Sequence, residues 1–151
     1  MIDYEVYDAD MVYIQEHADK AAEYNAALRA RATIGSYTSW SWSSDGIYSR
    51  TTDSAAGFTI GYYFTPVNNY LYFNAEITGA ARAPYLAVNK LNNDGSLSYV
   101  GSYNVASVGG EDYAWTNYRR ALNAGQNYTF SLWCGSGNWD YSSLDIYKSA
   151  M

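Results

Sequence analysis

Several residue types that mark familiar kinds of site are nearly missing from this sequence. Of 151 residues, one is histidine and one is cysteine, so the chain lacks the usual ligands of a zinc site and cannot form an internal disulfide. A hydrolytic triad needs a histidine beside its nucleophile. The only candidate, His17, lies in a segment with a helical pattern, where we interpret it as a solvated side chain. The sequence therefore predicts no catalytic activity of this kind, no metal and no other cofactor.

Positive charge and long apolar runs are also scarce. The chain has 9 basic against 15 acidic residues, a net charge of −6, and no cluster of Lys and Arg that could neutralise a row of phosphates. Its first ten residues, MIDYEVYDAD, are acidic where a secretory signal would be basic. No apolar run approaches the roughly 18 residues that a membrane span requires. We expect no nucleic-acid binding, no membrane insertion and no export signal.

Glycine and proline are absent before Thr33, whereas all 12 Gly, both Pro and all five Trp follow it. This shift divides the chain into an N-terminal segment, 1–32, and a second region, 33–151. Apolar and small residues recur in the first segment with the 3-4-3-4 spacing of one helical stripe. The stripe comprises Tyr4, Tyr7, Met11, Ile14, Ala18, Ala21, Asn25, Leu28 and Ala32. The segment is therefore predicted to be one long α-helix.

Two features favour a helix that associates with copies of itself. About 28 helical residues extend roughly 40 Å, which is longer than a small β-domain readily covers. Asn25 occupies a core position of the stripe, where asparagine pairs with its symmetry mates and fixes the register of a coiled coil. The predicted oligomerisation residues are Met11, Ile14, Ala18, Ala21, Asn25 and Leu28. The alternative is an amphipathic helix lying on its own β-domain, which the neighbouring Val12 and Tyr13 would suit.

Beyond Ile34 the period of the apolar residues changes from the helical value to two. Alternation marks the runs Phe58–Phe64, Leu71–Ile77, Leu86–Val88, Leu97–Tyr99, Tyr128–Leu132 and Leu144–Ile146. Turn residues such as Asn93, Asp94 and Gly95 separate these runs. The pattern predicts a mainly β region of about eight antiparallel strands forming a β-sandwich or jelly roll. Cys134, within YTFSLWCG, is expected to be a small buried hydrophobic residue.

Three carboxylates fall in predicted loops, namely Glu111, Asp112 and Asp140. Glycoside cleavage needs a pair of such groups, and calcium binding needs several hard oxygen ligands. No motif identifies an acid and a nucleophile, and no spacing resembles that of an EF-hand. We interpret these residues as solvated loop acids, with a glycan-cleaving enzyme as the least favoured hypothesis.

Aromatic residues interrupt the alternation in two segments, GGEDYAWTNYRR (109–120) and GSGNWDYSS (135–143). Tyrosine and tryptophan beside Asp, Asn and Arg suit stacking and hydrogen bonding to a glycan or a protein receptor. The candidate binding residues are Tyr113, Trp115, Tyr118, Trp139, Asp140 and Tyr141. The alternative is that these side chains pack between protomers or cover an end of the sandwich.

An N-terminal heptad-bearing helix followed by an aromatic β-domain resembles the receptor-binding ends of bacteriophage fibres. The segments GYYFTPVNNYLYFNAEI, LNAGQNYTFSLW and SSLDIYK are also similar to the strand rhythm of trimeric C1q/TNF-like jelly rolls. The resemblance implies a homotrimer in a virion, assembled in the host cytoplasm with other virion proteins and attaching to a receptor. A carbohydrate-binding module or lectin of cellular origin is the alternative.

Overall fold

The computed structural model describes residues 3–6, 33–42, 46–135 and 137–149, which contain thirteen β-strands. They are β1 (Asp3–Val6), β2 (Thr33–Ile34), β3 (Tyr37–Ser39), β4 (Tyr48–Thr52), β5 (Gly57–Ile60), β6 (Tyr62–Tyr63), β7 (Tyr70–Thr78), β8 (Tyr85–Leu91), β9 (Leu97–Asn104), β10 (Ser107–Gly109), β11 (Asp112–Ala121), β12 (Tyr128–Trp133) and β13 (Tyr141–Tyr147). The prediction of a mainly β chain is therefore confirmed.

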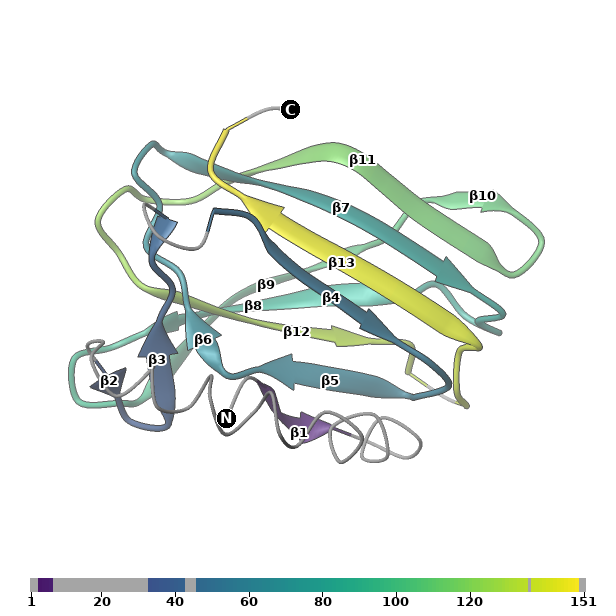
Figure 1. Cartoon of the computed structure of the whole chain (residues 1–151), viewed down its shortest axis with the longest axis horizontal. Helices are drawn as coiled ribbons and strands as arrows, with labels where there is room; N and C mark the ends of the chain where they lie inside the picture. The colour runs from purple at the N-terminus through teal and green to yellow at the C-terminus, as the bar shows by residue number, and fades with distance from the viewer. Residues whose placement is uncertain (1–2, 7–32, 43–45, 136, 150–151) are drawn as a thin grey trace.

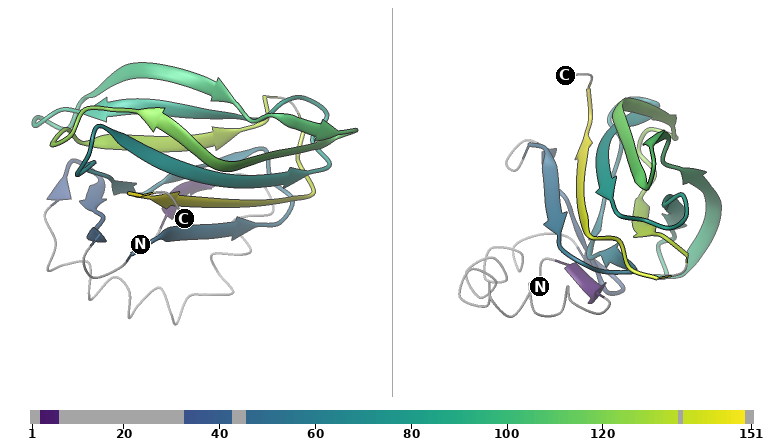
Figure 2. Two further views of the ribbon diagram at one scale, coloured as in Figure 1. Left: turned by 90° about the horizontal axis from the view of Figure 1, so that it is seen from above. Right: turned by 90° about the vertical axis from the view of Figure 1, so that its right-hand side faces the viewer.

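Two five-stranded antiparallel sheets pack face to face, as Figures 1 and 2 show. The first has the order β1-β5-β12-β8-β9 and the second the order β10-β11-β7-β13-β4. Successive strands cross repeatedly from one sheet to the other, so most neighbours within a sheet are distant in sequence, and β8-β9 and β10-β11 are the consecutive pairs. A third sheet, β2-β3-β6, lies at one end of this sandwich and contains the one parallel pair among the described strands, β3 with β6.

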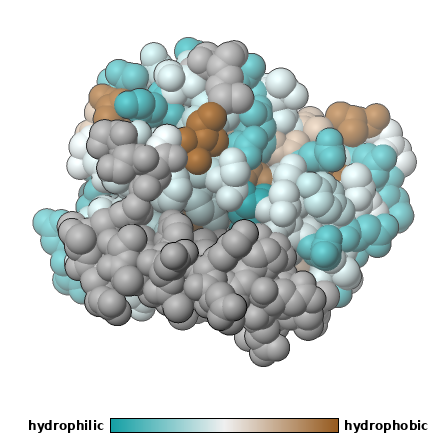
Figure 3. Space-filling view, in the orientation of Figure 1, coloured by the Kyte–Doolittle hydropathy of each residue, from teal (hydrophilic) through white to brown (hydrophobic). Residues whose placement is uncertain are grey.

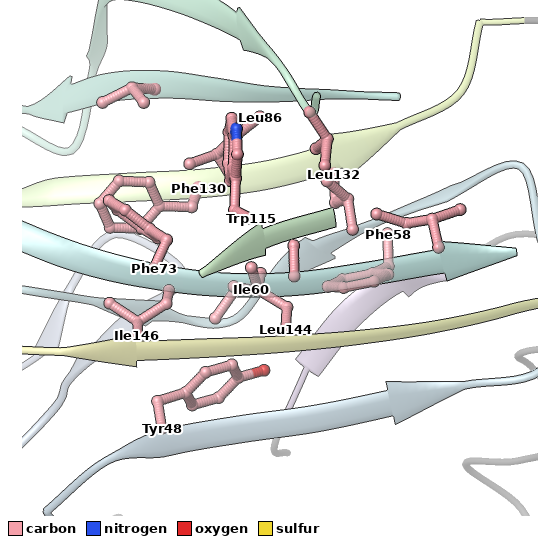
Figure 4. Close-up of a cluster of buried hydrophobic side chains, with 14 of the residues drawn as sticks. Tyr48, Phe58, Ile60, Phe73, Leu86, Trp115, Phe130, Leu132, Leu144 and Ile146 are labelled. Atoms are coloured by element: carbon pink, nitrogen blue, oxygen red, sulfur yellow. The ribbon is translucent and has the colours of Figure 1, made fainter. Parts of the chain in front are cut away.

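The core lies between the two large sheets, where strands β4, β7, β8 and β13 bury every second residue over most of their length. Leu71, Phe73, Ala75 and Ile77 on β7 follow this alternation, as the sequence predicted. Figure 4 shows Phe73 lying toward Phe130 of the opposite sheet, and the centroids of the two rings are 5.3 Å apart. Burial of this apolar surface is the main stabilising contribution to such a fold. On β9, by contrast, Leu97 and Tyr99 are exposed, and β10 is exposed throughout.

The N-terminal prediction is corrected in one place. Residues Asp3–Val6, which the stripe assigned to the start of the helix, form strand β1 and pair with β5, with Asp3 opposite Ile60. Pairing with an open sheet edge outweighs the local helical periodicity there. The predicted oligomerisation residues Met11, Ile14, Ala18, Ala21, Asn25 and Leu28, and also His17, lie outside the described residues. Within the described residues, no helix is long and apolar enough to cross a membrane.

Candidate functional site

The segment 109–120, predicted as an aromatic loop, is for the most part strand β11. Tyr113, Trp115 and Tyr118 on this strand pack against the core, and Trp115 is buried. Strict alternation would put Trp115 and Tyr118 on opposite faces because they are three residues apart. A β-bulge between them inserts one extra residue, so both rings face inward and stack with their centroids 4.1 Å apart. The prediction of a loop was wrong here.

Trp139 is also part of the core and not of a binding loop. Its side chain is 0% exposed, its indole N–H donates to the backbone oxygen of Asp53, and its ring packs edge-on against Phe58. A buried Trp is expected to find such an acceptor for its N–H. Nearby, Cys134 is buried as predicted, and desolvation raises the pKa of its thiol. Neither residue presents a surface to a ligand in this structure.

Asp140 and Tyr141 are the two candidate residues that do lie toward solvent. Tyr141 begins β13 and points away from the core, because Ser142 and Leu144 take the inward positions. Asp140 is exposed, but its carboxylate lies over Gly79, where a β-carbon would sit 2.1 Å from Oδ2 of Asp140. Asp140 therefore covers the turn after β7, and its role there is structural.

The loops that carry Asp140 and Glu111 do converge, at the turn between β7 and β8. The backbone N–H of Ala80 donates to the oxygen of Glu111, and that of Asp140 donates to the oxygen of Thr78. Glu111 and Asp112 are exposed. Among the described residues, no three acidic, histidine or cysteine side chains lie close enough together to hold a metal ion. The calcium possibility gains no geometric support from this arrangement.

The opposite, outward face of the β11-β7-β13 sheet carries a second group of aromatic and polar residues. We call it the outer tyrosine face, and it comprises Tyr70, Tyr72 and Asn74 on β7, Asn117 and Arg119 on β11, and Tyr147 on β13. Tyr72 lies at its centre, stacked on Tyr147 at 5.7 Å and edge-to-face with Tyr70 at 5.5 Å. The guanidinium carbon of Arg119 lies 5.4 Å from the centre of the Tyr70 ring. The face is thus a contiguous group of interacting rings.

A hydrogen-bond network fixes this face across three strands. Asn117, at the bulge of β11, has a φ of 49° and donates its backbone N–H to Oδ1 of Asn74 at 2.8 Å. The hydroxyl of Tyr147 donates to Oδ1 of Asn117 and lies 3.1 Å from Oδ1 of Asn74. Burial is the main cause that raises the pKa of Tyr147, with a further contribution from the charge of Asp145. A left-handed conformation is uncommon for a residue other than glycine, and such residues are concentrated at functional sites.

The chemistry available at the outer tyrosine face is hydrogen bonding from a rigid support. Tyr70 and Tyr72 are half-buried, whereas Asn117 and Arg119 are exposed, so hydroxyl, amide and guanidinium groups reach solvent beside aromatic surface. Sequence reasoning missed this face because it searched for aromatics in loops. The signal was present in YLYFNAEIT, where the tyrosines alternate with the buried Leu71 and Phe73.

Comparison with profiles of known protein families, with curated proteins and with solved structures gives no match for this chain.

Proposed function

We propose that this chain is a non-catalytic receptor-binding module of a virion fibre, working as a homotrimer and binding a glycan through the outer tyrosine face. The observation that supports the binding role is the network of Asn117, Asn74 and Tyr147, which lies beside Tyr72 on the same face of the sheet. It fixes a bulge and several polar groups on a regular sheet. Groups held rigidly before binding lose little conformational entropy when a ligand arrives.

The order of the strands supports the jelly-roll part of this proposal. Apart from the short strands, the two large sheets read β5-β12-β8-β9 and β4-β13-β7-β11. Eight strands in two sheets, with the chain crossing between the sheets at most connections, is the arrangement of a jelly roll, which occurs in viral capsid proteins and lectins. Function does not follow from a fold alone. The receptor role therefore rests on the outer tyrosine face, and the virion role on the sequence resemblance.

A glycan suits the face better than an apolar ligand does. Tyrosine hydroxyls, the Asn117 amide and the Arg119 guanidinium can donate to or accept from sugar hydroxyls, and half-buried ring surface can cover the sugar's C–H groups. A protein receptor that uses Tyr and Arg as anchors is the second candidate, because these residue types are frequent at interface hot spots.

A Tyr70→Ala/Tyr72→Ala double variant tests the proposal on a glycan array. The double variant should lose at least tenfold in affinity for any glycan that the wild type binds. Tyr85→Ala is the matched control, because Tyr85 is a half-buried tyrosine on the outward face of the opposite sheet. Equal binding by wild type and double variant, or equal loss in the control, would remove the outer tyrosine face from the proposal.

The homotrimer is tested separately through the predicted helix stripe. Introducing Lys at both Ile14 and Leu28 should abolish the trimer, because charged residues in a coiled-coil core are strongly unfavourable. Light scattering of the full chain at micromolar concentration gives the mass. A wild type of monomeric mass would contradict the trimer and leave the glycan site as a separate question.

A further inference from the structure

Strand β9 forms an open edge of the first sheet. The other edge of that sheet, at β5, is covered by β1, whereas β9 is bonded to β8 on one side and to no described strand on the other. β9 is eight residues long, from Leu97 to Asn104, and after Val105 and Ala106 the chain enters β10, Ser107–Gly109, at the edge of the second sheet. One stretch of chain therefore forms open edges of both sheets.

This stretch contains no charged residue. From Gly95 to Gly110 the sequence is GSLSYVGSYNVASVGG, which contains no acidic or basic residue, no histidine and no proline. Natural edge strands are normally protected by charged side chains, especially lysine, by proline, or by a covering element. The one protective device here is a register shift opposite Val88 and Asn89. The edge thus lacks most of the features that keep sheets from joining.

The same stretch carries most of the exposed apolar surface. Four of the six large hydrophobic side chains that are exposed in the described residues lie on it: Leu97 (44% exposed), Tyr99 (69%), Val100 (41%) and Val108 (64%). In Figure 3 hydrophobic atoms project at the upper right, over the position of β10 in Figure 1. Clustered exposed apolar residues mark interaction sites more often than scattered ones do.

We propose that the β9 edge pairs with the β9 edge of a second copy of this chain, so that the two first sheets join into one. Antiparallel pairing of the same strand relates the copies by a twofold axis. Every antiparallel register within Gly95–Gly110 matches uncharged residues with uncharged residues. The backbone N–H and C=O groups of the open edge gain partners, and Tyr99 and Val100 lose exposed apolar area.

Charge favours a second copy over a different protein as the occupant. The chain has a net charge of −6, so two copies repel wherever acidic surfaces meet, and a charge-free strip is where they can approach without that cost. A charge-free strip also offers no charged group with which an unrelated partner could be selected. The twofold contact is distinct from a threefold stalk, and it would join two trimers as readily as two monomers.

Charge placed on the edge tests the proposal in the full-length chain. Val100→Lys adds a lysine to the middle of the edge strand of each copy, which is a device by which natural edge strands prevent pairing, and at an exposed position it should leave folding intact. Thr51→Lys is the matched control, because Thr51 is an exposed residue on β4, the edge strand of the second sheet. Sedimentation velocity should give a mass for wild type and control that is at least twice the mass of Val100→Lys at the same concentration. The ratio is two if monomers pair, and it can be larger if trimers pair, because a trimer carries three β9 edges.

Hydrogen exchange provides the second measurement. On raising the concentration of the wild type, amides of β9 should exchange more slowly, and those of β4 should not. Tyr99→Glu replaces Val100→Lys if the latter unfolds, as judged by circular dichroism. Equal masses for wild type and edge variants, with β9 amides unprotected at every concentration, would overturn the proposal and leave the edge to a strand of another protein.

Discussion

The two faces of the β11-β7-β13 sheet carry aromatic residues in similar number, but the residues differ in how far they are buried. On the inner face, Trp115 and Phe73 are buried against the opposite sheet, with ring centroids 6.4 Å apart. On the outer face, Tyr70 and Tyr72 remain half-exposed and contact one another and Arg119. Whether an aromatic side chain on this sheet reaches solvent therefore depends on which face it takes, and not on its type or on the polarity of its neighbours. Inner aromatics should control stability, and outer ones should control recognition.

The largest effect is expected from Trp139→Ala. This side chain is wholly buried, so its removal should lower the free energy of unfolding by about 3 to 5 kcal/mol through lost apolar contact and a residual cavity. Urea unfolding followed by circular dichroism measures the change. Tyr141→Ala, two residues away and outward-facing, is the control and should cost much less. Trp139 precedes β13, so it tests the general rule behind the comparison, and a Trp139→Ala variant of near wild-type stability would break the expected link between burial of an aromatic side chain and stability.

A smaller loss of stability is expected from Gly79→Ala, at the turn that Asp140 covers. Gly79 has a φ of +73°, and its new β-carbon would meet the Asp140 carboxylate at 2.1 Å. Strain and crowding together should cost about 1 to 3 kcal/mol. In the Gly79→Ala/Asp140→Ala double variant the crowding disappears and the strain remains, so part of the loss should be recovered. Strictly additive losses would show that the carboxylate does not lie over the glycine.

Tyr147→Phe should reduce stability by about 1 kcal/mol, the typical value of one buried hydrogen bond.

The same substitution should also change how stability responds to alkaline pH. Burial raises the pKa of Tyr147 above the value of about 10 found in an unfolded chain. The folded state then retains the phenolic proton longer, so this contribution to stability is complete below pH about 10 and is lost as the pH rises through the folded-state pKa. Between about pH 9 and about 11 the free energy of unfolding should therefore fall less steeply with pH for Tyr147→Phe than for wild type, which urea unfolding at a series of pH values measures. The same pH dependence in both proteins would mean that the Tyr147 hydroxyl is not shielded from solvent in the folded state.

The smallest effect on stability is expected from Tyr70→Ala on the outer tyrosine face. Its ring is half-exposed, and surface substitutions usually change stability by about 0.5 kcal/mol or somewhat more where rings contact one another. Binding should nevertheless fall, which would sharpen the contrast with the buried Trp139. Thermal unfolding and the glycan array, run on the same sample, separate the two effects. A large loss of stability would place Tyr70 with the inner aromatics.

Regular alternation made much of the fold readable from the sequence. Strands β7, β12 and β13 bury the residues that their period of two indicated, including Phe73, Phe130 and Leu144. The candidate site was less accessible because the bulge at Asn117 breaks the alternation, so that β11 resembled a loop. Asparagine tolerates a left-handed conformation better than most residues, and it was the one local sign of that bulge. The open edge at β9 could not be read either, since edge position depends on strand order and not on local pattern.

The pairing of β4 with β13 has a consequence for how the chain folds. Arg50 on β4 lies opposite Leu144 on β13, and Leu144 lies opposite Ala75 on β7, which in turn lies opposite Trp115 on β11. Loops spanning much of the chain must close before the second sheet is complete, and proteins with such distant contacts fold slowly. During synthesis on the ribosome, β4 and β7 emerge long before β13 can join them. Until then the apolar strands remain open to neighbouring chains, so yield in cells should depend strongly on temperature and on chaperone capacity.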